Sequence, residues 1–290
     1  MLHQKPLLMA LFMGAFLLNS CKKDEPSPAE PMLIVKIAVD STQERLGNTG
    51  APVSLPIGHA GQHPLFNKIS AHYLELAPSA FTLLGKGTVV YHAPETQAGG
   101  DTAIDFQQAT VIKPGEVFLK VPIKNITPGS YEWVRLSVSY QNCDVRFRYG
   151  GVDYNSTLAG FVGYNNYITS FVVKNQTVSV NASKKQGFWA FETPFNVVTG
   201  QSPAGATTVP NPLFNTSPIP QGSCVVTGSF ADNLVITGNE QADVSITLSL
   251  STNNSFEWID TNANGIWDID STGAEQVVDM GLRGLIPKKD

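Results

Sequence analysis

The chain has 290 residues, of which 42% are hydrophobic and only 15% are charged, and its formal net charge at pH 7 is −5. This apolar content is too high for a globally disordered chain. The small negative charge provides no basic surface for nucleic acid. We therefore expect a compact protein whose outer surfaces are mostly neutral and polar, with no nucleic-acid partner.

The first 20 residues have the layout of an export signal. A short basic start precedes an apolar run over residues 7–18, and the chain reads Leu-Asn-Ser-Cys over residues 18–21. This layout is typical of a bacterial lipoprotein signal peptide, which is removed before a cysteine that receives fatty acyl chains such as palmitate. The run is shorter than the about 20 residues that a membrane-spanning helix needs. We therefore expect the chain to be attached to membrane lipid through Cys21.

Charged residues and prolines follow this cysteine. Lys22, Lys23, Asp24 and Glu25 come directly after Cys21. In this respect the start resembles the surface lipoproteins of Bacteroidetes, in which a lysine and acidic residues follow the lipid-bearing cysteine. The resemblance implies a location on the outer membrane, facing the cell exterior, with residues 21–31 as a solvated tether. It implies no activity.

Apolar residues at alternate positions predict strands along most of the remaining chain. The clearest segment is 244–251, where Val or Ile or Leu alternates with Ser or Thr, so that one face should pack on a core and the other should lie in water. Segments 33–39, 117–123 and 134–141 show the same period, and no segment keeps the 3.6-residue period of a helix. We expect an all-β protein, an antiparallel β-sandwich with little helix. Further strands are expected at 70–76, 88–91, 145–149, 168–173, 177–180, 188–192 and 224–230.

The length beyond the signal is enough for one large β domain or for two ordinary domains. We expect two β lobes, residues 32–150 and 151–290, that meet near residues 143–154. The second lobe includes a segment rich in Pro, Gly, Ser and Thr at 200–222, which predicts a long irregular surface loop.

Two cysteines remain when Cys21 carries lipid. An oxidising exported environment permits Cys143 and Cys224 to form a disulfide. The alternative is that each is a small buried apolar residue. The sequence leaves both open.

Four of the five histidines lie in one region of the sequence. His59 and His63 are followed by His72 and His92. Imidazole is a favoured ligand of copper and zinc, so this region indicates a copper- or zinc-handling protein that uses His59, His63 and His72; ordinary loop and strand histidines are the alternative. The N-terminal half also resembles the MbnP-like family of copper-associated periplasmic proteins, in its strand at 69–76 and its Pro-Gly-Ser-Tyr turn at 128–131. This resemblance implies copper but no particular ligand.

Aromatic residues cluster among glycines and asparagines at 149–167. Aromatic faces that stack on sugar rings, with amides for the hydroxyl groups, are a common way to bind a glycan. In a β protein such residues also belong to the core or to strand edges. The candidate residues are Tyr149, Tyr154, Phe161, Tyr164 and Tyr167.

Residues 260–275 resemble a calcium loop. Asp260, Asn262, Asn264 and Gly265 match the first half of an EF-hand loop, with oxygens at alternate positions and a glycine at the sharp turn. The twelfth position holds Ser271 in place of the usual glutamate, so either Asp270 or Glu275 must complete the oxygen ligands. The alternative is a polar hairpin turn without metal. The candidate Ca²⁺ ligands, in an expected structural role, are Asp260, Asn262, Asn264, Ile266 through its carbonyl, Asp268, Asp270 and Glu275.

Familiar catalytic patterns do not occur in the sequence. It has no Gly-x-Ser-x-Gly elbow, His-Glu-x-x-His helix, phosphate-binding glycine loop or Cys-x-x-Cys pair. Our leading hypothesis is a non-enzymatic, calcium-stabilised lipoprotein of the outer membrane for adhesion or for capture of an extracellular ligand such as a glycan or a protein. The alternatives are a copper- or zinc-handling protein and a glycan-processing enzyme, because paired carboxylates of a glycosidase converge only in the folded chain.

Overall fold

The structure is a computed structural model that describes residues 30–290, except 48–49, 80 and 204–224. Residues Pro31–Asp290 form one compact unit of strands with two short 3₁₀ turns, η1 (Phe106–Gln108) and η2 (Ile123–Asn125). The strands are β1 (Met32–Asp40), β2 (His59–Gln62), β3 (Leu65–Ala77), β4 (Thr88–His92), β5 (Glu95–Thr96), β6 (Ala103–Asp105), β7 (Val117–Pro122), β8 (Gly129–Tyr149), β9 (Val152–Phe161), β10 (Asn166–Val172), β11 (Thr177–Lys184), β12 (Phe188–Glu192), β13 (Val197–Gln201), β14 (Val225–Ile236), β15 (Val244–Ser251), β16 (Phe256–Ile259), β17 (Asp268–Asp270), β18 (Gly273–Ala274), β19 (Val277–Met280) and β20 (Leu285–Lys289).

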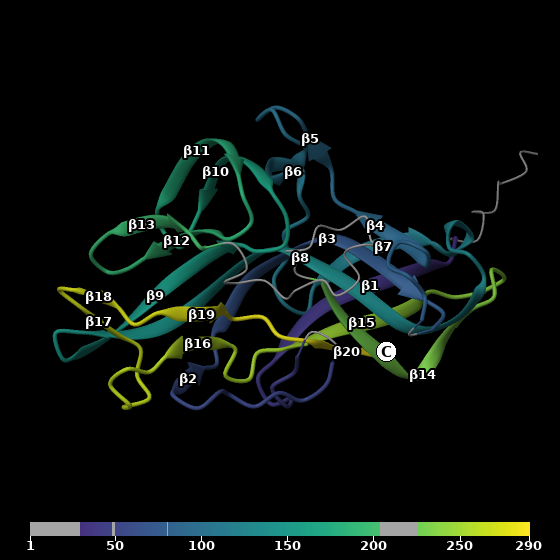
Figure 1. Ribbon diagram of the computed structural model, residues 1–290. Coiled ribbons are helices and arrows are strands. Elements are labelled where there is room, and N and C mark those ends of the chain that lie inside the picture. Colours follow the sequence, from purple (N-terminus) through teal and green to yellow (C-terminus); the bar gives the residue numbers. More distant parts are fainter. Residues whose placement is uncertain (1–29, 48–49, 80, 204–224) are drawn as a thin grey trace, which may run out of the picture. The chain divides into compact units, whose positions relative to one another are not determined.

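Two sheets pack face to face as a sandwich (Figure 1). The first has the order β20-β15-β1-β7, and the second contains β3, β4, β8, β9, β12, β13, β14, β17 and β18. Apolar side chains at alternate positions of both sheets meet in one core, because such side chains all point to the same face of a strand. The expected all-β sandwich with little helix is confirmed. The core includes Leu33, Val35 and Ile37 of β1, Ile246, Leu248 and Leu250 of β15, Leu74 and Leu76 of β3, and Val134, Leu136 and Val138 of β8.

The long strand β8 connects this core with two others. It has 21 residues, which is about 70 Å of extended chain. Its far end contributes Val145 and Phe147 to a second core, which the sheet β19-β16-β2 covers with Phe256 and Trp258. A third core lies between β8, β9 and β12 and the sheet β11-β10-β6-β5. The candidate site described below lies where this last sheet meets β3 and β4.

The pairing of the N-terminal strand differs from a purely antiparallel sheet. β1 lies between β7 and β15, and it pairs with β7 antiparallel but with β15 parallel. A parallel pair needs a long connection between its strands. Here most of the chain lies between them, so the sequence pattern of each strand alone did not indicate this direction.

The outer face of β15 is less exposed than the alternation predicts. Ser249 and Ser251, which we expected in water, are only 3% and 0% exposed. The segment with Gln43 and Glu44 covers these serines and explains their burial. Gln43 Nε2 donates a hydrogen bond to Ser249 Oγ, and Ser251 Oγ donates one to the Glu44 carbonyl at 2.7 Å. The neutral hydroxyls of this face are therefore used to hold a covering segment.

The boundary that we expected at residue 150 falls in the turn of the β8–β9 hairpin. Gly150 and Gly151 have φ values of 58° and 81° and connect the paired residues Tyr149 and Val152. A two-residue turn with positive φ at both positions matches the twist of antiparallel strands, and glycine adopts it without strain. β8 and β9 then pair along their length from Tyr149–Val152 to Tyr140–Phe161, within the compact unit of residues Pro31–Asp290.

Several expectations concern residues outside the described part of the chain. These are the signal at 1–20, Cys21, most of the tether at 21–31, residues 204–222 of the expected loop, and Cys224. Cys143 is fully buried in the second core. Because Cys224 lies outside the described residues, the pairing of the two cysteines stays a prediction. In the part of the chain that the structure describes, no helix has the length and apolar character that crossing a bilayer requires.

Candidate metal centre

Three metal-ligating side chains converge where β3, β4 and β5 meet. They are His72 of β3, His92 at the end of β4 and Glu95 of β5, and one ligand atom from each lies within 4.8 Å of the others. Within the described ranges, no other group of three or more His, Cys, Asp or Glu side chains meets this distance. This cluster is therefore the candidate metal site in the described part of the chain.

Strand pairing places these residues together. β3 and β4 are antiparallel with Tyr73 opposite His92, and the next residue, Ala93, donates its backbone N–H to the His72 carbonyl at 2.7 Å. The chain then leaves β3, and Glu95 pairs with Ile104 of β6. Glu95 thus reaches the two histidines from a different sheet.

The distances between the ligand atoms fit a small metal ion. Glu95 Oε1 lies 3.1 Å from His72 Nε2 and 3.9 Å from His92 Nε2. Ligand atoms about 2.0–2.1 Å from a tetrahedral zinc ion are roughly 3.4 Å from one another. These two separations lie on both sides of that value, and the three ligand atoms lie within 4.8 Å of one another, so side-chain movement is needed to bring all three atoms to one ion.

His72 is a buried, neutral imidazole. Its side chain is 4% exposed, and the ring of Tyr164 stacks on it with 4.6 Å between centroids and an interplanar angle of 12°. Burial and the nearby His92 together lower the pKa of His72 to about 4, although the hydrogen bond and charge of Glu95 act in the opposite direction. The ring is therefore uncharged at neutral pH. Its Nδ1 is buried and has no hydrogen-bond partner.

His92 is half exposed and oriented by the backbone. Its Nδ1 lies 3.1 Å from the carbonyl of Ala93. A hydrogen bond at that distance requires the proton on Nδ1, which leaves the lone pair on Nε2, the nitrogen that faces Glu95. A backbone acceptor that fixes the ring in this way is a common support of a metal-ligating histidine.

The histidines expected to bind metal are only partly brought together. His72 joins His92, but His59 and His63 belong to other contacts: His59 Nδ1 lies 2.5 Å from Glu257 Oε1, and His63 Nδ1 accepts a hydrogen bond from the Asn254 N–H at 2.8 Å. Sequence analysis missed Glu95. The available signal was its position three residues after His92, in the sequence His-Ala-Pro-Glu.

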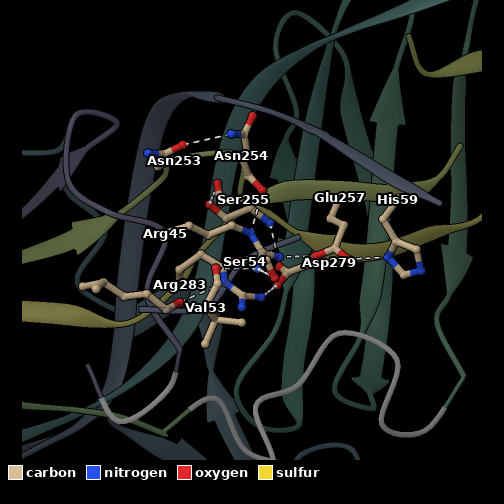
Figure 2. A network of polar contacts seen from close by, with 12 residues as sticks. Arg45, Val53, Ser54, His59, Asn253, Asn254, Ser255, Glu257, Asp279 and Arg283 are labelled. Carbon is tan, nitrogen blue, oxygen red and sulfur yellow. Dashed lines mark hydrogen bonds and ion pairs between the residues drawn. The ribbon is translucent and has the colours of Figure 1, made fainter. Parts of the chain in front are cut away.

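His59 belongs to a structural network (Figure 2). Glu257 contacts both His59 and Arg45, and the Arg45 guanidinium also donates to the carbonyls of Asn254, Val53 and Ser54. Arg45 and Glu257 are 8% and 6% exposed. Because every contact of this guanidinium is to the protein itself, the network fastens the segment between β1 and β2 to β16 and leaves His59 engaged.

The acidic Asn/Gly loop is held together by its own hydrogen bonds. Asp260 accepts from the backbone N–H groups of Asn264 and Gly265, and Asp268 accepts from the side-chain amides of Asn262 and Asn264. The three carboxylates Asp260, Asp268 and Glu275 do not form a group of the kind described for His72, His92 and Glu95 in the described residues. Calcium binding here stays a prediction.

The two residues proposed to complete the loop lie in different places. The buried Glu275 reaches back to the N–H groups of Thr261 and Asp268. Asp270 instead accepts hydrogen bonds from Thr272 and Gly273 in the next turn. Of the two, Glu275 is the one whose carboxylate contacts the loop.

The aromatic residues at 149–167 do not form one surface. Phe161 is fully buried in the third core, and Tyr164 lies on His72. Tyr154 packs edge-on against Phe195, 5.1 Å between centroids, and Tyr149 lies 6.3 Å from the same ring. The sequence cluster is thus divided between the core, the candidate metal centre and one hairpin tip.

Comparison of the chain with protein-family models, with curated proteins and with solved structures finds no match. The function must therefore be argued from the geometry of the candidate site.

Proposed function

We propose that this protein binds a divalent transition-metal ion, zinc or copper, through His72, His92 and Glu95. The observation that supports the proposal is the convergence of two imidazole nitrogens and one carboxylate oxygen within 4.8 Å. Two nitrogens and one oxygen suit zinc and copper, whereas calcium and magnesium prefer ligand sets made of oxygen.

The different exposure of the ligands suits an ion that is exchanged. His72 is buried, but His92 and Glu95 are 49% and 30% exposed. Three protein ligands leave a fourth position of a tetrahedral ion open to water or to a ligand of a partner. We therefore propose acquisition or handling of the metal.

The metal-free arrangement sets a cost on binding. Glu95 Oε1 can only accept a hydrogen bond as a carboxylate, so His72 Nε2 donates one to it and carries the ring proton. Coordination of a metal through Nε2 requires this proton to move to Nδ1. That atom is buried without a hydrogen-bond partner. An unpaired buried donor costs about 1–3 kcal/mol, so we expect a moderate affinity.

The location of the protein is part of the proposal. The export signal and Cys21 support an outer-membrane lipoprotein whose metal centre faces outward. Labelling of cells with a palmitate analogue tests this: the wild-type chain should be labelled, Cys21→Ser should not, and equal labelling of both would reject lipid attachment at this residue.

Titration calorimetry of the purified protein with Zn²⁺ and Cu²⁺ tests the metal centre. We expect one ion per chain, with affinity lowered at least tenfold by Glu95→Gln and by His92→Ala, both at exposed or half-exposed positions. His63→Ala, at an exposed histidine outside the cluster, is the matched control and should bind as the wild type does. Binding that all three variants retain, or that only His63→Ala removes, would contradict the proposal.

A further inference from the structure

A cavity separate from the candidate metal centre lies between the second sheet and the sheet β19-β16-β2. Its volume is about 440 Å³, and its lining comes from β9, β12, β13, β17 and β18 of the second sheet and from β16 and β19 of the other sheet. Pockets that bind small molecules commonly have volumes of about 300–1,000 Å³. The cavity is therefore large enough for a ligand.

One wall is a rigid aromatic surface around Trp267. Its indole Nε1 donates a hydrogen bond to the Glu275 carbonyl at 3.0 Å. Its ring packs against Phe256 and Phe191, with 4.9 Å and 5.5 Å between centroids. Because these contacts already fix the indole, its side chain loses little conformational entropy when a ligand binds.

A second indole also lines the cavity. Trp189 of β12 is paired with Gly200 of β13, and a Cβ at Gly200 would lie only 2.3 Å from Trp189 Cζ2. The missing side chain lets the indole lie directly against the β13 backbone. Two indoles thus line one apolar space, together with Leu158 and Met280.

The polar side chains at this cavity are engaged elsewhere. Gln201 donates from Nε2 to the Gln186 carbonyl at 2.7 Å. Glu275 is the charged member of the described lining, and its carboxylate accepts hydrogen bonds from Thr261 and from the Asp268 N–H. Along its described lining the cavity therefore offers apolar and aromatic contacts and no cation to neutralise an anionic ligand.

We propose that this cavity binds a neutral, largely apolar small molecule with a flat ring system, which contacts Trp189 and Trp267. Removal of apolar ring surface from water provides the affinity, and the aromatic walls favour a flat shape. The site is independent of the proposed metal centre.

N-phenylnaphthylamine, a neutral probe that becomes fluorescent in apolar surroundings, tests this inference on the purified protein. We expect saturable binding of one probe per chain, with a Kd in the micromolar range, unchanged by a metal chelator. Naphthalene sulfonate probes of similar size should bind at least tenfold more weakly because of their charge.

Variants that fill the cavity identify the site. Val198 lines the cavity and is 41% exposed, so Val198→Trp should fill the space without disturbing a core and should weaken binding at least tenfold. Val235→Trp on β14, at a valine 57% exposed, adds the same side chain elsewhere and should leave binding unchanged. If circular dichroism shows that Val198→Trp does not fold, Ala274→Trp on the exposed rim replaces it. Absence of saturable binding to the wild type, or wild-type binding by the folded filled variant, overturns the proposal.

Discussion

At Glu257 one buried carboxylate joins segments that are about two hundred residues apart in the sequence. It contacts Arg45 and His59, which the alternation of the sequence does not relate to β16. The prediction of His59 as a metal ligand did not include its contact with Glu257, because the sequence of a glycine-rich segment gives no information about the partner of an imidazole in the folded chain. Only the pairing of β2 with β16 places His59 opposite Ile259 and next to this carboxylate.

Glu257→Ala should destabilise the protein by about 3–5 kcal/mol, because it leaves the buried Arg45 without its carboxylate. Urea unfolding of the wild type and the variant measures this difference. The control is Asp153→Asn, which breaks the exposed Arg148–Asp153 pair and should change the midpoint little. Equal effects of the two substitutions would show that the Glu257 network does not hold the fold.

At the scale of elements, one carboxylate on β12 organises the turn between β10 and β11. Glu192 is 7% exposed and accepts hydrogen bonds from the backbone N–H groups of Lys174, Asn175 and Gln176. Burial acts to raise the pKa of Glu192, but these hydrogen bonds outweigh it, so the pKa lies below its ordinary value of 4.5. The ionised form is thus favoured in the folded protein.

The sign of the pH effect follows from this lowered pKa. The unfolded chain binds a proton at Glu192 more readily than the folded protein does. The stabilisation that ionised Glu192 provides is therefore complete above about pH 4.5 and is lost as the pH falls through the pKa of Glu192 in the folded protein. Glu192→Gln should therefore be less stable than the wild type at pH 7, by about 1–3 kcal/mol. The difference between the urea midpoints should shrink as the pH falls below 4.5, and a difference that stays constant from pH 7 to pH 3 would contradict this role.

The loop at 260–275 carries the calcium prediction. If Ca²⁺ binds the oxygens of Asp260, Asn262 and Asp268, it binds only the folded loop and raises the melting temperature. Asp260→Asn should remove this increase, whereas Asp270→Asn should retain it, because Asp270 faces Thr272. Equal melting of the wild type in Ca²⁺ and in chelator would reject the calcium loop.

For the whole molecule, the sequence predicted the strands better than their arrangement. The alternation at 244–251 coincides with β15, and that at 117–123 gives β7, because the period of two is local. Three features depend on register between distant strands: the parallel β1–β15 pair, the burial of Ser251, and the meeting of His72 with Glu95. Spacing along one strand contains no information about such register, which is why Glu95 of the candidate metal centre was missed.

The position of β1 between β7 and β15 determines when the first sheet can be completed. Its neighbour β15 emerges more than two hundred residues after it, and β20 is last of all. Until β15 and β20 have been synthesised, the first sheet consists of β1 and β7 alone, and one edge of β1 lacks its parallel partner. We therefore expect the first sheet to form late in the folding of the chain.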